Sequence, residues 1–354
     1  MTAPQSDWLE DRLRNAIHAE ASRMPATPPP NTAAARATAG RPRQARVRGL
    51  VASTAAGVVI AVIGAVTAVH CITDRSGVAV AATPPMLVYD HTDAPAIGPL
   101  LKRLAARAAN LPTLTPPPGQ YVYFPQETWN LIVSVGSSVT TQVQPNVIKT
   151  WVPASGLKLQ TETLGEPIQA GPLSQSEERA AINDVSDSSP TRQWITPDSD
   201  EFSSMASLPA RPAKLFRALV EAEDSDAPPY PVNTHELNAV HDAFGGLEQY
   251  LTYSTPGARF MSSFYRMLEL IPDVTDAGWV TDRAGRAGIG ISVPTTKGGG
   301  GNPDIIIVNP RTGQLLDVEG LATSPTKTGI KPPYVQSYVI YQPARLVHRL
   351  GSAQ

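Results

Sequence analysis

The chain has 354 residues, enough for one large domain or two small ones. Its net charge of −2 conceals an uneven distribution, because residues 1–48 carry eight Arg against four acidic residues and the remainder carries −6. The acidic main body argues against nucleic acid as a partner. The single cysteine, Cys71, excludes an internal disulfide.

A short helix is predicted near the N-terminus, over residues 7–23. Asp7 and Glu10 form a pair like a capping box at its start. Its apolar face consists of Trp8, Leu9, Leu13 and Ile17. A helix this short is marginal alone in water, so the face predicts a cytoplasmic partner protein or the inner leaflet. Residues 24–48, rich in Pro, Ala and Arg, predict a disordered basic linker.

Residues 49–73 form the one long run without a charged side chain. As a helix, these 25 residues would span roughly 37 Å, more than the hydrocarbon core of a bilayer. The flanking arginines are Arg36, Arg41, Arg43, Arg46 and Arg48. Because arginine marks the cytoplasmic side, we expect a single-pass protein of the cell membrane with residues 74–354 outside. A cleaved signal peptide would not have 48 residues before its apolar run.

Small residues recur every four positions in this run. They are Gly49, Ser53, Gly57, Ala61 and Ala65. Such a stripe predicts a homodimer through the membrane helix, although an alanine-rich segment also produces the spacing by chance. Cys71 follows His70, which is too bulky for a lipid-attachment signal. A thiol without a role, an intermolecular disulfide and a reactive thiol all stay open for it.

After a tether at 74–85, residues 86–350 predict one extracytoplasmic α+β domain. The predicted helices are 94–110 with Asp93 as cap, 176–185, 212–223, 233–247 and one opening at Thr255-Pro256. The predicted strands are 86–89, a meander of three to five strands over 120–165, then 278–281, 287–293, 304–308, 314–318 and 334–341. Pro145-Asn146 is among the predicted turns. Strand runs separated by a helical run indicate a curved antiparallel sheet with helices packed on one face.

The motifs in this domain carry little chemistry. Ser155 and Lys158 match S-x-x-K, but residues three apart on a strand point to opposite faces. His235 and His241 are six apart, on different faces of a helix, so they do not predict a metal site. The acidic loops at 198–201 and 223–226 lack the pattern of a calcium loop. We therefore assign no catalytic, cofactor-binding or metal-binding residue.

A family resemblance rests on the arm at residues 8–21, the apolar run, and residues 100–111, 119–124, 261–274, 281–286 and 309–316. In these segments the chain resembles a group of actinobacterial single-pass membrane proteins of unknown function, often encoded near extracytoplasmic-function sigma factors. The outer domain also looks like lipoprotein-carrier and envelope-stress-sensor folds, which hold acyl chains or partner proteins on a concave sheet. The resemblance supplies no catalytic residue.

These observations favour a membrane-anchored, non-enzymatic sensor or regulator. Its outer domain would bind an envelope protein or lipid ligand, and its arm a cytoplasmic partner such as a sigma factor. The arm has His18 but no cysteine, unlike zinc-type anti-sigma domains, which use both. The alternative is a membrane-tethered lipid or lipoprotein carrier, which requires a continuous apolar groove between sheet and helices.

Overall fold

The computed structural model of the chain describes the main body of the domain. The described residues are 83–135, 139–155, 158–168, 173–186, 190–195, 208–223, 237–295, 302–325, 328 and 330–351. The chain divides into two units, Met1–Ser53 and Thr54–Gln354, and every described residue belongs to the second.

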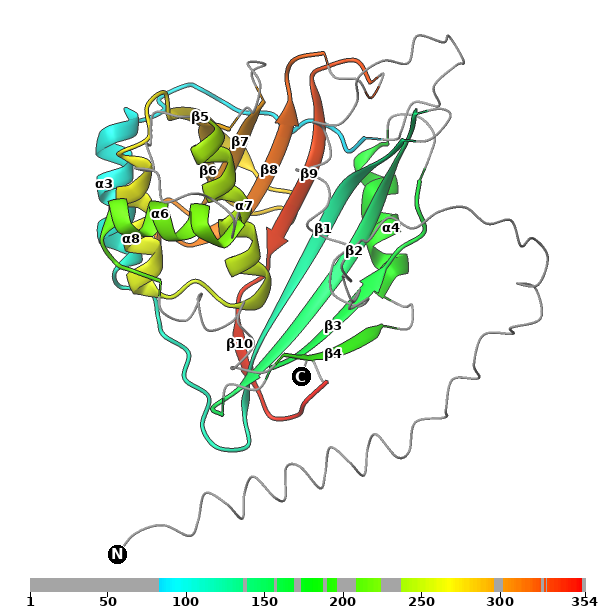
Figure 1. The fold of residues 1–354 in the computed structure, drawn as a ribbon, viewed down its shortest axis with the longest axis vertical. Coiled ribbons are helices and arrows are strands. Elements are labelled where there is room, and N and C mark those ends of the chain that lie inside the picture. The colour runs from blue at the N-terminus through cyan, green and yellow to red at the C-terminus, as the bar shows by residue number, and fades with distance from the viewer. Residues whose placement is uncertain are drawn as a thin grey trace, which may run out of the picture. The chain divides into compact units, whose positions relative to one another are not determined.

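Five helices and ten strands make up this part of the chain (Figure 1). The helices are α3 (Ile97–Ala108), α4 (Gln175–Ser186), α6 (Pro212–Glu223), α7 (Leu237–Tyr253) and α8 (Ala258–Leu268). The strands are β1 (Tyr121–Val135), β2 (Val139–Pro153), β3 (Lys158–Leu164), β4 (Thr191–Ile195), β5 (Thr275–Thr281), β6 (Ala287–Pro294), β7 (Pro303–Val308), β8 (Leu315–Ala322), β9 (Tyr334–Tyr341) and β10 (Arg345–Val347).

The strands form one antiparallel sheet in the order β4-β3-β2-β1-β9-β8-β7-β6-β5. Each half is a meander of strands that are consecutive in sequence, and the two halves meet where Gln126 of β1 lies opposite Tyr341 of β9. Beyond the end of β9, β10 continues along β1, with Val347 opposite Tyr121. The last strands of the chain therefore join the two meanders into a single sheet.

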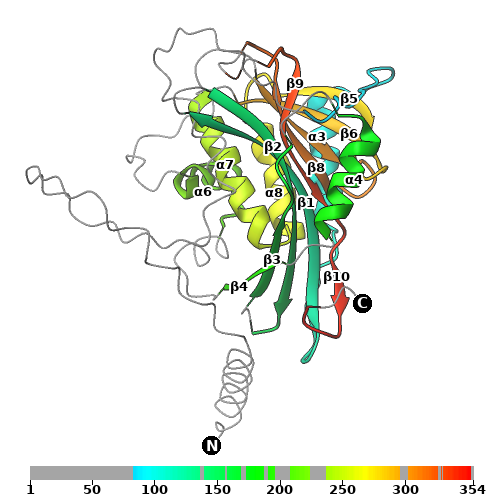
Figure 2. The ribbon, with the colours of Figure 1, turned by 90° about the vertical axis from the view of Figure 1, so that its right-hand side faces the viewer.

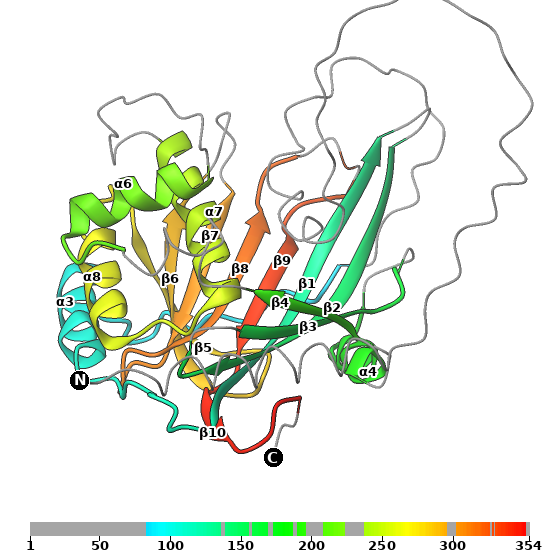
Figure 3. The ribbon, with the colours of Figure 1, turned by 60° about the horizontal axis from the view of Figure 1, so that its bottom comes forward.

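One face of the sheet, which we call the helix-covered face, carries α3, α6, α7 and α8. Alternation along β7 shows how the strands divide their side chains between the faces. Ile306 and Val308 pack with the helices, whereas Ile305 and Ile307 belong to a core on the opposite face. Figure 3 shows these four helices gathered over the β5–β8 side, while the long strands β1 and β2 lean away from them.

The opposite face is covered by α4 and the segment Thr83–Asp90. Ile182 and Val185 of α4 belong to the same hydrophobic core as Trp129 of β1, and Leu87 joins it. Figure 2 shows α4 on one side of the sheet and α6 and α7 on the other. The expectation that all helices pack on one face is therefore wrong for α4. Its apolar residues are few, so its sequence did not indicate which face it would cover.

Most predicted elements of the outer domain are confirmed, including the three-stranded meander and α6 at its predicted bounds. Residues 86–89 form no strand, and the isolated bridge nearby joins the next residue, Asp90, to Trp279. Asp93 does not cap α3, which begins after Ala96 without a side-chain cap. Pro145-Asn146 is not a turn but lies inside β2, where β3 ends and the missing N–H of a proline is tolerated.

Two short strands, β4 and β10, were not predicted. Both add to a sheet edge or to an existing strand, so their sequences need no strong alternation of their own. Within the ranges that the structure describes, no helix is long and apolar enough to cross a membrane. The predicted membrane run, the arm and the tether up to residue 82 lie outside those ranges.

Candidate functional site

The helix-covered face changes character where the helices end. On β1, β2 and β3 the side chains of this face are largely polar, although they are as buried as a core. They are Gln126, Thr128, Asn146, Thr150, Lys158 and Gln160, and together we call them the polar floor. Apolar residues are the usual occupants of such positions, because burying a polar group without a partner costs free energy. The polar floor therefore differs from the apolar core that fills the same face beneath the helices.

Part of the polar floor is satisfied by hydrogen bonds within the protein. Gln126 donates from Nε2 to the backbone carbonyl of Leu251 in α7 at 2.6 Å. Asn146 donates from Nδ2 to Oε1 of Glu162 at 2.7 Å. These bonds tie β1 to α7 and β2 to β3, so the floor is held in a fixed arrangement.

Four side-chain oxygens of the floor have no hydrogen-bond partner and are shielded from solvent. They are Thr128 Oγ1, Asn146 Oδ1, Thr150 Oγ1 and Gln160 Oε1. Each such atom costs roughly 1–3 kcal/mol relative to a bonded one. The four come from three neighbouring strands and share one face, so a single polar molecule or peptide segment on that face could satisfy them together.

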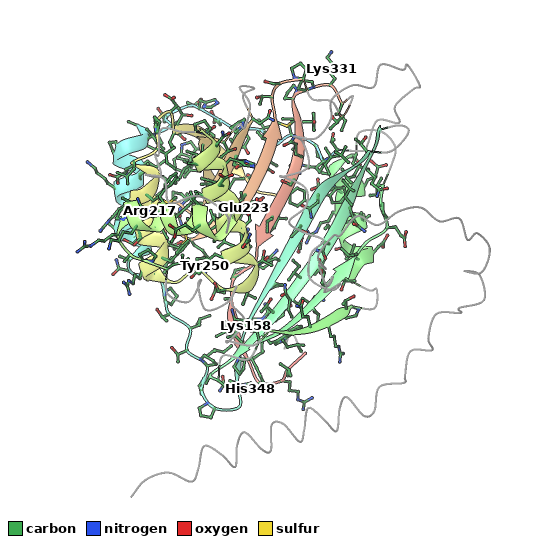
Figure 4. All side chains as sticks on the ribbon, in the orientation of Figure 1. Lys158, Arg217, Glu223, Tyr250, Lys331 and His348 are labelled. Atoms are coloured by element: carbon green, nitrogen blue, oxygen red, sulfur yellow. The ribbon has the colours of Figure 1, made fainter. Side chains whose placement is uncertain are left out.

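Lys158 supplies the floor with a titratable amine. It is the first residue of β3, and Figure 4 shows it at the end of the sheet where β3 begins. Burial lowers the pKa of its ammonium group to about 7, so the charged and neutral forms are close in free energy at neutral pH. Ser155, its partner in the S-x-x-K match, is exposed while Lys158 is buried. The two do not form a nucleophile and base on one surface.

Carboxyl groups lie where α7 crosses the sheet. Burial, followed by repulsion from Asp304 and Glu223, raises the pKa of Glu248 to about 8. Burial raises the pKa of Asp304 on β7 to about 7, against a hydrogen bond with Thr295 that lowers it. Glu248 lies three residues before Leu251, whose carbonyl binds Gln126. The C-terminal half of α7 therefore borders both the carboxyl groups and the polar floor.

A second buried polar cluster occupies the opposite face. Arg283 donates from Nε to Glu319 of β8 at 2.6 Å and from Nη1 to Glu178 of α4 at 3.0 Å. Its Nη2 donates to the carbonyl of Pro85, and Tyr89 donates its hydroxyl to Glu319. We call these groups the Arg283 network. It fastens α4 and the segment Thr83–Asp90 to the sheet.

The polar floor offers hydrogen-bonding groups and one titratable amine. In the described part of the chain, no three His, Cys, Asp or Glu side chains are arranged to hold a metal ion. Below α3, α6, α7 and α8 the face is filled by their apolar side chains. Beyond them, on β1 to β3, its buried side chains are the polar floor and the apolar Val122, Phe124 and Ile148. The unpartnered oxygens of the floor favour a ligand with hydrogen-bonding groups over an acyl chain.

The polar floor could not be found from the sequence. All the predicted site residues lie outside the described residues. They are the small-residue stripe (Gly49, Ser53, Gly57, Ala61 and Ala65), the apolar face of the arm (Trp8, Leu9, Leu13 and Ile17) and the flanking arginines (Arg36, Arg41, Arg43, Arg46 and Arg48). The one available signal was the polar residues that alternate with apolar ones along β1 to β3. That alternation reads equally well as a solvent-facing side.

Comparison with known proteins adds little to this geometry. No family model matches the chain, and no curated protein matches it. One solved structure, described as the complex structure of Pseudomonas aeruginosa MucA/MucB, matches over 73% of this chain and 58% of that chain, at 11% identity and a TM-score of 0.25. The match spans less than two thirds of that chain. A likeness this low carries no argument about fold, partner or activity, so the family resemblance inferred from the sequence stays a prediction.

Proposed function

We propose that this chain is a membrane-anchored, non-enzymatic binding protein of the sensor or regulator class. Its outer domain, residues 86–350, recognises a polar envelope ligand or an extended protein segment on the polar floor. The apolar run 49–73 and the arginines before it support the anchor and its orientation. The arm at residues 7–23 faces the cytoplasm and offers its apolar side to a partner, for which a sigma factor is the candidate.

The observation that carries the binding role is the set of unpartnered oxygens on Thr128, Asn146, Thr150 and Gln160. A fold selected for stability alone would place apolar side chains there, as it does on the same face beneath the helices. Unsatisfied buried groups that cluster on one surface are expected where a ligand completes the hydrogen bonds. The tethered lipid carrier is the weaker alternative, because acyl chains would leave these oxygens unpaired.

The test uses the full chain, purified from its native membranes in mild detergent. Native mass spectrometry should detect a bound polar molecule or peptide on the wild type, and the Thr128→Val/Thr150→Val double variant should lose it. Thr161→Val is the matched control, because Thr161 is buried on the opposite side of β3, directly after the floor residue Gln160. Equal occupancy of all three proteins, or an acyl lipid retained by the double variant, would refute the polar-ligand role.

The arm and the membrane run are tested separately. Copurification from membranes should recover a sigma factor with the wild type, and replacement of Trp8 and Leu13 by Ala should release it. Recovery of no sigma factor would remove that partner and leave the outer domain's role untouched. A Gly57→Ile change that leaves self-association intact in a membrane reporter assay would remove the homodimer.

A further inference from the structure

The helices on the helix-covered face carry an unusual charge on their solvent side. Seven exposed cations lie in α3, α6 and α8, and an eighth directly precedes α6. They are Lys102, Arg103, Arg107, Arg211, Lys214, Arg217, Arg259 and Arg266, and we call them the basic surface. Neither α3 nor α8 contains an acidic residue. The acidic residues of α6, Glu221 and Glu223, lie at its C-terminal end.

The cations of the basic surface have no acidic partner within the described part of the chain. Among the residues that the structure describes, none of the eight forms an ion pair; Arg107 donates to the backbone carbonyl of Pro310. Cations elsewhere in the domain do pair, as Arg179 does with Glu127 and Arg286 with Asp282. The positive potential of the three helices is therefore left for an external anion.

The three helices form one surface. α8 packs against both α3 and α6, and all three lie together in Figures 1 and 3. Figure 4 shows Arg217 of α6 on the side where α3 and α8 lie. An open hollow of about 500 Å³ along α6 is lined by Lys214, Arg217 and Glu221, among others. A broad surface with cations spread over three helices fits an extended anionic plane better than a small ligand, which needs convergent groups in a cleft.

We propose that the basic surface docks on the anionic phospholipid headgroups of the membrane that anchors the chain. This inference rests on the anchoring part of the proposed function. Only residues 74–82 separate the predicted membrane run from the first described residue, and they reach at most about 30 Å. α3 is the first helix after that tether. The bilayer is thus the anionic surface present at the highest effective concentration, which favours it over an acidic protein partner.

Energy transfer in lipid nanodiscs tests the docking with the full chain. A donor dye is placed on Ala106→Cys of α3 in a Cys71→Ser background, and the acceptor on lipid headgroups. Transfer should be stronger in discs containing phosphatidylglycerol than in phosphatidylcholine alone, and high salt should abolish the difference. Each cation near the surface contributes about fivefold to docking, so Lys102→Gln, Arg103→Gln and Arg217→Gln together should weaken it about 100-fold.

The control variant removes the same types of charge elsewhere. Arg192, Lys331 and Arg349 are exposed on β4 and in loops outside the basic surface, and their change to Gln should leave the transfer unaltered. Equal transfer with and without phosphatidylglycerol, or an equal response of the two triple variants, would overturn the docking while leaving the anchor intact. A chain that does not enter the discs at all would overturn the anchor, and the docking with it.

Discussion

Replacing Thr150 by Val should stabilise the unliganded protein, and this is the sharpest consequence of the polar floor. Thr150 lies on β2 with a fully buried side chain, opposite Phe124 of β1 and Gln160 of β3. Its hydroxyl has no hydrogen-bond partner. Valine has nearly the same shape and suits a strand at least as well. The substitution therefore removes an unpaired polar atom and leaves the packing in place.

The expected gain is about 1–2 kcal/mol in the free energy of unfolding, the lower part of the range for an unsatisfied buried group. For a domain of this size such a gain raises Tm by roughly 2–8 °C. Urea unfolding of the full chain in detergent, followed by tryptophan fluorescence, measures it, with Thr161→Val on the opposite side of β3 as control. A loss of more than 1 kcal/mol in Thr150→Val would mean that the hydroxyl is bonded in the unliganded protein, and the reasoning would fail.

Three further predictions concern the helices and the opposite face. Glu248→Gln should raise the free energy of unfolding by a few kcal/mol above pH 8, because the raised pKa of about 8 means that ionised Glu248 destabilises the folded state. The gain should vanish towards pH 4.5, where Glu248 is protonated in the folded protein. Thermal unfolding as a function of pH measures it, and an effect independent of pH would contradict the prediction. Gly246→Ala should lower the free energy of unfolding by about 1–3 kcal/mol, because a Cβ would overlap the backbone carbonyl of Leu219 in α6. The control is Gly98→Ala in α3, where the Cβ meets open space, and it should be neutral or stabilising in the same assay. Arg283→Ala should lower the free energy of unfolding by about 3–5 kcal/mol, because the carboxylates of Glu319 and Glu178 would stay buried without their partner. Amide hydrogen exchange should rise first in Thr83–Asp90, which Arg283 holds through the carbonyl of Pro85.

The sheet and most of its helices could be predicted because their patterns are local. Apolar residues at every second position predicted β1 and β3, and apolar residues with a 3.6-residue period predicted α6 and α8. Each of these patterns places the apolar side chains on one side of its element. Gly285 and Gly313 have positive φ, which glycine adopts at little cost, and each lies in a short connection between two strands. Failures came where no periodic signal exists, as for β4 and β10.

Net charge was the most misleading quantity. The −6 beyond residue 48 describes an acidic body, yet α3, α6, α8 and the residue before α6 present eight cations that form no ion pair within the described residues. α3 lies more than a hundred residues before α6 and α8 in the sequence, and only the packing of α8 on both α3 and α6 brings the charges together. Composition averages over surfaces, whereas electrostatic potential depends on distance.

By itself the sequence predicted an α+β domain with an antiparallel sheet, from strand-period runs linked by short turns and separated by a helical run. It also predicted the charge-free run and its flanking arginines as a membrane anchor. Only the tertiary structure decided which polar residues are buried and which cations adjoin. Thr128, Asn146, Thr150 and Gln160 alternate with apolar neighbours just as solvent-facing residues do. Their burial without partners arises because three strands bring them to one covered face, and that is a property of the pairing between strands, not of any single strand.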